Sequence, residues 1–166
     1  MYTKIMTHEA YMQAAIEVAK QTRTQGGTAI GAVLVSNKTG EIIASGGSSV
    51  GITHDPTSHA EVTCIRNASR MLSTDNLCDC TIYSTLEPCM MCLSAATWAR
   101  IPKVYFGAYR KDVDASLFDI KGFVSDERQA TRMNLREDAQ MQVHGGILEA
   151  ECAQLLQGYH DHIEAA

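Results

Sequence analysis

Apolar side chains recur at helical spacing near the start of the chain and predict a first helix over about residues 8–25. Charged side chains fall on the opposite face of this helix. The apolar stripe consists of Tyr11, Ala14, Ala15, Val18 and Ala19. Gly26 and Gly27 follow it and end the helix, because glycine favours helix termination. The pattern therefore predicts an amphipathic helix that covers a core.

Short runs of β-branched and aromatic residues predict strands along the rest of the chain. The expected strands are 30–35, 41–45, 80–84, 103–108 and 141–143, the last extending at most to 144. A turn at residues 37–40 joins the first two strands into a hairpin. The hairpin then leads into a region where strands alternate with helices.

Three further helices are expected, and the segments between the elements are polar. Their ranges are about 59–72, 89–99 and 148–160. Small polar residues just before residue 59 are available to cap the first of them. The Gly, Ser and Thr-rich segment 46–57 predicts a loop, and 109–137 a polar loop with one or two short helices. This order indicates an α/β fold, a three-layer αβα sandwich with a five-stranded mixed sheet.

Length and composition fit a single domain over residues 1–166. Hydrophobic residues make up 45% of the chain and charged residues 20%, as in an ordinary globular protein. The apolar runs are too short for a membrane span, and the N-terminal residues lack the apolar segment of a secretory signal. We therefore expect a cytoplasmic protein without membrane contact.

The charge balance argues against a nucleic-acid partner. The chain has 14 Lys and Arg against 19 Asp and Glu, a formal net charge of −5. Proteins that bind nucleic-acid backbones usually carry a basic face. The residues available for a local basic patch are Arg66, Arg70, Arg100, Lys103, Arg110 and Lys111. The alternative is that these six side chains form an ordinary solvated surface.

The strongest chemical signal is a His-x-Glu motif followed by a Pro-Cys-x-x-Cys motif. His59, Cys89 and Cys92 lie at the starts of predicted helices, where the positive end of the helix dipole favours thiolates. Three protein ligands leave one position open for water, the arrangement of a catalytic zinc ion. Zinc lowers the pKa of that water toward about 7. Glu61, two residues beyond His59, is then placed as the general acid and base.

Two other interpretations of the cysteine pair remain open at this point. A redox dithiol is one, although Leu86, Glu87 and Pro88 separate the motif from the preceding strand. A four-ligand structural zinc site is the other, and its fourth ligand would come from Cys64, Cys78 or Cys80. A core histidine at position 59 would remove the metal site altogether.

The two motifs resemble those of the cytidine-deaminase-like superfamily of zinc-dependent deaminases. Segments 54–62 and 86–92 are similar to its purine branch, which contains guanine deaminases and tRNA adenosine deaminases. The resemblance implies a five-stranded sheet, a homodimer, one zinc ion per chain, and hydrolytic replacement of a ring amino group with release of ammonia. It also implies that Glu61 shuttles protons while the N–H groups of Ala60 and Cys89 hold the substrate and the developing tetrahedral centre.

The same resemblance suggests residues that select the substrate. Asp112, with Asp114 as a close competitor, matches an aspartate that accepts hydrogen bonds from guanine. Trp98 matches a residue that walls the pocket, although a core aromatic is an equal alternative. Ile30 occupies the place where the family packs an apolar side chain on the substrate ring. Together these residues favour a guanine-like substrate.

One position departs from the family. Ser48 stands where relatives usually have an asparagine, and a hydroxyl cannot offer both a carbonyl and an amide. We therefore expect a free guanine-like base or a related heterocycle, with tRNA adenosine or a cytosine-type base as alternatives. By analogy with guanine deaminases, the C-terminal segment crosses to the partner subunit. Its candidate capping residues are Tyr159, His160 and His162.

Overall fold

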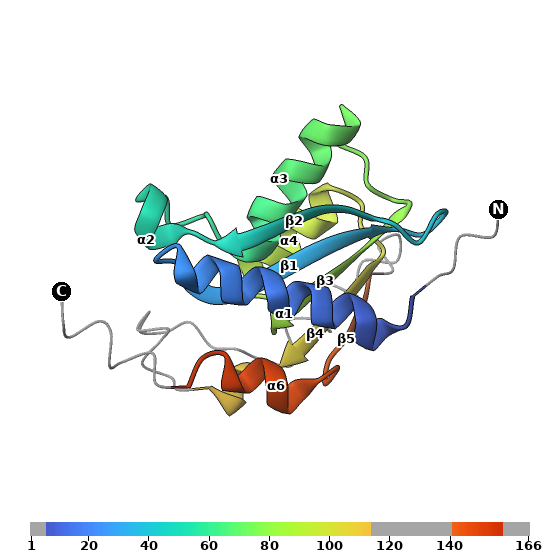
Figure 1. Ribbon diagram of the computed structural model, residues 1–166. Helices are drawn as coiled ribbons and strands as arrows, with labels where there is room; N and C mark the ends of the chain where they lie inside the picture. Colours follow the sequence, from blue (N-terminus) through green and yellow to red (C-terminus); the bar gives the residue numbers. More distant parts are fainter. Residues whose placement is uncertain (1–5, 114–140, 158–166) are drawn as a thin grey trace.

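The computed structural model describes residues 6–113 and 141–157, which form a five-stranded sheet with helices on both faces (Figure 1). The strand order is β2-β1-β3-β4-β5. β1 pairs antiparallel with both β2 and β3, whereas β3 with β4 and β4 with β5 are parallel. The strands are β1 (Thr28–Ser36), β2 (Ile42–Ser48), β3 (Cys80–Leu86), β4 (Lys103–Ala108) and β5 (Gln142–His144). The predicted mixed sheet of five strands is confirmed.

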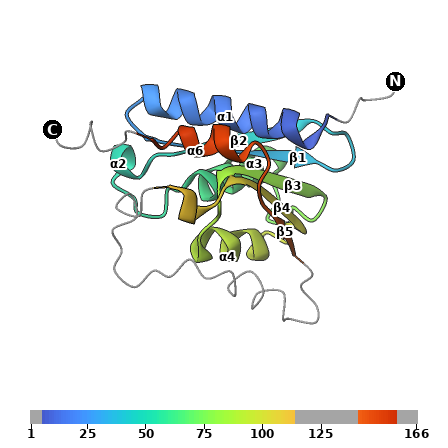
Figure 2. The ribbon, with the colours of Figure 1, turned by 90° about the horizontal axis from the view of Figure 1, so that it is seen from below.

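The helices form the two outer layers (Figure 2). α1 (His8–Thr24) and α6 (Glu149–Gln154) cover one face, while α3 (Ala60–Leu72) and α4 (Met90–Trp98) cover the other. Two glycines let the helices approach closely. A Cβ atom on Gly31 of β1 would lie 2.3 Å from the Ala15 carbonyl of α1. One on Gly46 of β2 would lie 2.5 Å from the Ala60 carbonyl of α3.

The central strand β3 is buried along its whole length and sends alternate side chains to the two faces. Tyr83 and Thr85 face α1, where the Thr85 hydroxyl accepts a hydrogen bond from the Gly31 N–H at 3.1 Å. Ser84 faces the opposite side, where it contacts Glu61 of α3. The strand therefore contributes to an apolar core on one side and to a polar, buried site on the other.

Most predicted elements match, but three differ. β2 continues to Ser48, into the segment expected to be a loop. Because Gly46 has no side chain, the backbone of α3 packs directly against the strand at this point. The rest of that segment contains a short helix, α2 (Val50–Thr53). The last helix, expected over 148–160, begins after Leu148 in a left-handed conformation and ends at Gln154, so it is shorter than predicted.

Among the described residues, no helix combines the length and the apolar character that crossing a membrane requires. Asp114 and the candidate capping residues Tyr159, His160 and His162 lie outside the described residues.

Candidate active site

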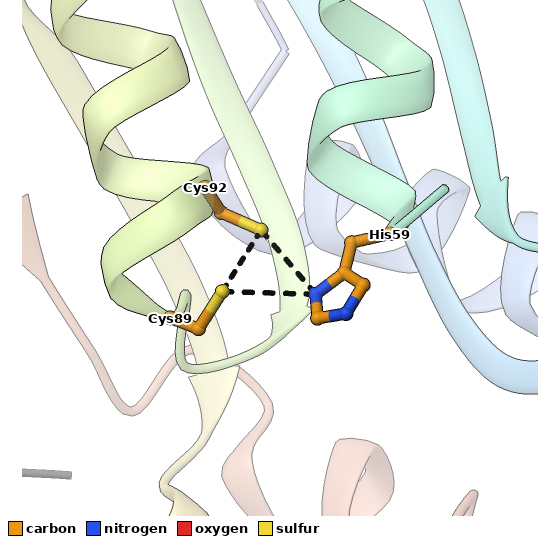
Figure 3. A group of neighbouring side chains, drawn as sticks. All are labelled: His59, Cys89 and Cys92. Carbon is orange, nitrogen blue, oxygen red and sulfur yellow. Dashed lines mark hydrogen bonds between the residues drawn. The ribbon is translucent and has the colours of Figure 1, made fainter. Parts of the chain in front are cut away.

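Two helix starts bring the predicted metal ligands together (Figure 3). The Nδ1 atom of His59 lies 3.7 Å from the sulfur of Cys89 and 3.6 Å from that of Cys92. The two sulfurs are 3.4 Å apart. Both cysteines are buried and the histidine is half-buried. Residues 30 positions apart in the sequence thus point their donor atoms at one spot.

The backbone explains why these side chains are free to converge. His59 and Cys89 are the N-cap residues of α3 and α4, and neither side chain makes a capping hydrogen bond. The expectation that a small polar residue caps α3 is wrong. Asp55 instead accepts hydrogen bonds within its own loop, from the backbone N–H and the hydroxyl of Thr57 and from the hydroxyl of Ser58. The N-cap position is thereby left to a metal ligand.

The donor set fits a zinc ion. Zinc–sulfur bonds of about 2.3 Å and zinc–nitrogen bonds of about 2.0 Å in tetrahedral geometry separate the sulfurs by about 3.8 Å and sulfur from nitrogen by about 3.6 Å. The separations of 3.4, 3.6 and 3.7 Å are close to these values. In the described residues this is the one group of histidine, cysteine and acidic side chains close enough to share an ion. His59, Cys89 and Cys92 therefore form a group of donors that fits a zinc ion.

Hydrogen bonds among the three predicted ligands shift the pKa values of their side chains. The hydrogen bond between the two thiols lowers the pKa of Cys89 to about 3 and, together with burial, raises the pKa of Cys92. The hydrogen bond with Cys89 raises the pKa of His59. The three donor atoms are in hydrogen-bond contact with one another. Coordination of zinc requires each ligand to be deprotonated, so metal binding releases protons.

Glu61 lies in the first turn of α3 and is nearly fully buried, with 5% of its surface exposed. Its Oε2 atom accepts a hydrogen bond from the Cys92 thiol at 3.3 Å, so the carboxyl group is in contact with the metal ligands. Its Oε1 atom accepts a hydrogen bond from the Ser84 hydroxyl at 3.0 Å. Burial raises the pKa of the carboxyl group, which suits a residue that both accepts and releases a proton.

Sequence reasoning missed Ser84. It follows four residues of β3 and precedes two, so nothing in its local pattern separates it from an ordinary buried strand residue. The available signal was strand alternation, because Ser84 must face the side opposite Tyr83. Without knowing that α3 covers that side, the pattern could not connect Ser84 with Glu61.

Three predicted substrate residues lie in α3, β2 and β1. Ala60 is the first residue of α3, where the N–H groups have no partner within the helix. Ser48 is buried at the end of β2, and a hydrogen bond of 2.9 Å from the N–H of Ser49 to the carbonyl of Ser58 ties this end to the segment before His59. Ile30 is a buried residue of β1, next to Gly31, which faces α1, so Ile30 projects toward the α3 side.

Trp98 and Asp112 lie farther along their elements. Trp98 is the last residue of α4 and 86% exposed, so the alternative of a core aromatic is wrong. Asp112 is an exposed residue in a 3₁₀ turn (Arg110–Asp112), and its Oδ2 atom accepts the N–H of Tyr109 at 3.2 Å. This contact stabilises the turn itself. The roles of both residues toward substrate stay predictions.

The geometry argues against two of the alternatives, a four-ligand structural zinc site and a core histidine at position 59. Cys64, Cys78 and Cys80 are free thiols outside the ligand group, and the thiol of Cys64 donates to the carbonyl of Ala44. No fourth cysteine is therefore placed to complete a structural zinc site. His59 is not a core histidine, because its ring points at the two sulfurs.

The six basic residues considered for a patch do not gather in one place. Lys103 begins β4 and Arg110 follows its end, so they are about 20 Å apart along the strand. Arg66 on α3 pairs with Asp55 at 3.5 Å and donates to the Thr57 hydroxyl. These positions fit the alternative of an ordinary solvated surface better than a single basic patch.

Comparisons with known proteins agree with this site. Residues 5–108 match the family described as the cytidine and deoxycytidylate deaminase zinc-binding region. The chain is 43% identical over 115 residues to guanine deaminase of Bacillus subtilis, covering 69% of this chain and 72% of that protein. It is 39% identical over 155 residues to the tRNA-specific adenosine deaminase of the same organism, covering 91% and 87%.

The fold is similar to that of the guanine deaminase from Nitrosomonas europaea, with a TM-score of 0.81. The similarity covers 95% of this chain and 87% of that one at 22% identity, so it concerns the fold alone. The zinc ligands, the buried glutamate and the sequence match point to the same family. The chain belongs to the cytidine and deoxycytidylate deaminase zinc-binding family and is a zinc-dependent hydrolase of C–N bonds.

Proposed function

We propose that this chain deaminates a free guanine-like base or a closely related heterocycle. The reaction replaces a ring C–NH₂ group with C=O, consumes one water and releases one ammonia. The observation that carries the proposal is the contact between the Glu61 carboxylate and the ligand group, at 3.3 Å from the sulfur of Cys92. A structural zinc site has no use for a buried carboxylate beside its ligands.

The roles of the side chains follow from their positions. Bound zinc supplies a Lewis acid that makes water a nucleophile at neutral pH. Glu61 takes the proton from the attacking water, delivers it to the ring nitrogen and then assists the leaving amine. The N–H groups of Ala60 and Cys89 donate to the substrate and to the oxygen of the tetrahedral centre, because both precede the hydrogen-bonded ladders of their helices.

The serine at position 48 favours a small substrate. The hydrogen-bonding edge of that substrate differs from the edge that the asparagine usual in the family would contact. Within the described residues the hydroxyl of Ser48 has no hydrogen-bond partner, and no fully buried side-chain oxygen is left without one. The hydroxyl therefore reaches accessible space, although the residue as a whole is buried. A hydroxyl donates and accepts through one oxygen atom, whereas an amide accepts through its carbonyl oxygen and donates through its NH₂ group.

The electrostatics also favour a small base. The basic side chains are distributed over opposite ends of β4 and over α3, and the chain carries a formal net charge of −5. Neutralisation of phosphates supplies much of the affinity of nucleic-acid binding proteins, so a dispersed arrangement weakens that mode of binding. The carboxyl group of Asp112, in an exposed turn after β4, remains our candidate acceptor for guanine N–H groups, with Asp114 as its competitor.

A tRNA adenosine deaminase is the second candidate. The similarity to the tRNA-specific enzyme of Bacillus subtilis extends over 91% of this chain, against 69% for the guanine deaminase. Shared packing, as well as shared chemistry, can account for the additional matched length. This candidate therefore needs to be tested alongside the first.

The deciding experiment measures ammonia release from free bases, nucleosides and tRNA with the zinc-loaded protein. We expect turnover of guanine or a related base, and its loss in Glu61→Gln, which keeps the size of the side chain and removes its basic oxygen. Glu17→Gln is a matched control, because Glu17 is an exposed glutamate on α1. Conversion of tRNA adenosine to inosine without turnover of any small base would establish the second candidate instead.

The quaternary structure is a separate part of the proposal. We expect a homodimer with one zinc ion in each subunit. Light scattering of the purified protein together with metal analysis checks both numbers. A monomer that is fully active would contradict the expected dimer.

A further inference from the structure

We propose that Ser84 is a positioning residue for Glu61: its hydroxyl anchors Oε1, so that Oε2 alone is presented to the metal centre and carries the proton. The inference rests on the proton-carrying role proposed above for Glu61. It assigns different tasks to the two oxygens of one carboxyl group, and it gives a function to a strand residue outside both zinc-binding motifs.

The contact itself is short and lies in the interior. The Ser84 hydroxyl donates to Oε1 of Glu61 at 3.0 Å, with Ser84 fully buried and Glu61 95% buried. A hydrogen bond from a neutral donor to a carboxylate is stronger than one between neutral groups, and water does not compete for it here. Ser84 is therefore able to fix the rotation of the glutamate side chain.

The support behind Ser84 is rigid. It lies in the central strand β3 and pairs with Ala32 of β1 on one side and with Phe106 of β4 on the other. Glu61 stands in the first turn of α3, an independent element packed on the same face. The hydrogen bond thus ties the helix that carries Glu61 and His59 to the centre of the sheet. A carboxylate held from two elements has less freedom than one held by its own helix.

The second oxygen faces the opposite way. Oε2 of Glu61 is 3.3 Å from the sulfur of Cys92, which places it toward the group of metal ligands. Because Ser84 occupies Oε1, a proton taken up at Oε2 moves along one defined direction between water and substrate. Without the anchor, both oxygens compete for the same position, and the carboxyl group samples orientations that do not reach the reacting atoms.

A simpler explanation is that Ser84 is only a small residue that fills the space beside Glu61. That explanation makes size the important property, whereas the proposal makes the hydroxyl important. Ser84→Ala removes the hydroxyl and nearly preserves the size. Ser84→Thr keeps the hydroxyl and adds a methyl group. The two explanations therefore predict opposite orders of activity for the two variants.

The experiment uses the full-length, zinc-loaded protein and the base with the highest turnover in the panel of free bases. We expect Ser84→Ala to lower kcat by about 10–100-fold, the usual cost of removing a group that orients a reacting residue, with KM changed little. Ser84→Thr restores most of kcat. Metal analysis is expected to give one zinc per chain in both variants, so that lost metal does not explain the effect.

The infrared carboxylate band of Glu61 gives a readout that does not depend on turnover. The band is identified as the difference between the wild-type and Glu61→Gln spectra. We expect it to shift in Ser84→Ala and to stay in place in Ser84→Thr. If Ser84→Ala yields too little folded protein, the same band in Ser84→Gly, which also lacks the hydroxyl, answers the question.

Thr85→Val is the matched control. It removes a buried hydroxyl from the next residue of the same strand, on the side that faces α1, where Thr85 accepts the N–H of Gly31. We expect a lower melting temperature and an unchanged kcat and infrared band. If this variant loses kcat as strongly as Ser84→Ala, the effect belongs to the strand and the proposal is wrong.

The outcomes separate this inference from the proposed function. Full activity in Glu61→Gln would remove the proton-carrying role of Glu61, and the role of Ser84 with it. An inactive Glu61→Gln together with wild-type kcat and an unshifted band in Ser84→Ala would overturn the role of Ser84 alone. A kcat lower in Ser84→Thr than in Ser84→Ala would support the explanation by size and would also overturn it.

Discussion

The two sides of the central strand β3 use buried polar groups in opposite ways. On the side of α1, the hydroxyl groups of the buried tyrosines form hydrogen bonds with other groups of the protein. The Tyr83 hydroxyl forms a hydrogen bond of 2.8 Å with Nδ1 of His8, and its ring stacks on Tyr105 with centroids 5.1 Å apart. The Tyr11 hydroxyl donates to the carbonyl of Gly40 at 2.8 Å. This side stabilises the fold without any added group.

On the side of α3 and α4, the buried polar groups are ionisable and form hydrogen bonds with one another. Two thiols, a histidine and a carboxyl group meet where burial makes charge costly. Burial raises the pKa of Glu61, and the hydrogen bond with Cys89 raises the pKa of His59. The difference teaches that the polar groups on one face of the strand stabilise the fold, whereas those on the other face form a group that fits a metal ion.

The largest effect is expected from removing a metal ligand. Cys89→Ala takes one of three donors from the site, so zinc binding and ammonia release should fall together, activity by about 1,000-fold or more. Cys78→Ala is the matched control, because Cys78 is exposed and outside the ligand group. Metal analysis and turnover check both variants. Retention of zinc and activity by Cys89→Ala would contradict the assignment of a metal site to the side of β3 that faces α3 and α4.

A large loss of stability is expected from a side chain at Gly31. Its Cβ atom would lie 2.3 Å from the Ala15 carbonyl, and the backbone of α1 cannot shift as a side chain can. Gly31→Val should lower the free energy of unfolding by about 3 kcal/mol or more, measured by urea denaturation. Gly51→Ala is the control, since nothing lies within 4 Å of a Cβ there. A stable Gly31→Val would show that α1 is not pressed against the sheet.

A core substitution on the α1 side should cost stability without changing the chemistry. Met12 of α1 is fully buried, so Met12→Ala should lower the free energy of unfolding by about 2–5 kcal/mol while kcat per zinc-loaded folded molecule is unchanged. Met71→Ala, at a residue 68% exposed on α3, should change stability little. Loss of kcat in Met12→Ala would show that the two sides are coupled through β3.

The smallest effect is expected at Trp98, an exposed residue at the end of α4. With 86% of its surface exposed, Trp98→Ala should change the free energy of unfolding by less than about 0.5 kcal/mol. KM for the base with the highest turnover then tests its role in the pocket. A KM equal to that of the wild-type protein would show that the prediction of a pocket wall is wrong.

Local patterns were enough for much of the fold. The apolar stripe around Ala15 predicted α1 within one residue of its observed end, and the run from Lys103 to Ala108 predicted β4 at its full length. The patterns failed where a tertiary contact replaced a local preference. Gly46 is typical of a loop by composition, yet it lies in β2 because α3 packs directly on it.

The candidate site divides in the same way. His59, Cys89 and Cys92 were predicted from the residues, because a metal requires specific donor types and both motifs place them at helix starts. The partners of the basic residues were not predictable, because contacts such as the ion pair of Arg66 with Asp55 depend on tertiary packing.

The sequence by itself indicated the group of metal ligands, the glutamate beside it and the order of strands and helices, since each depends on residue type or on short-range spacing. The tertiary structure alone decided that Ser84 meets Glu61, 23 positions away, at 3.0 Å. Strand alternation limits a residue to one of two faces. The packing of α3 on the sheet decides which side chain Ser84 meets on its face. That packing joins parts of the chain that no local pattern connects.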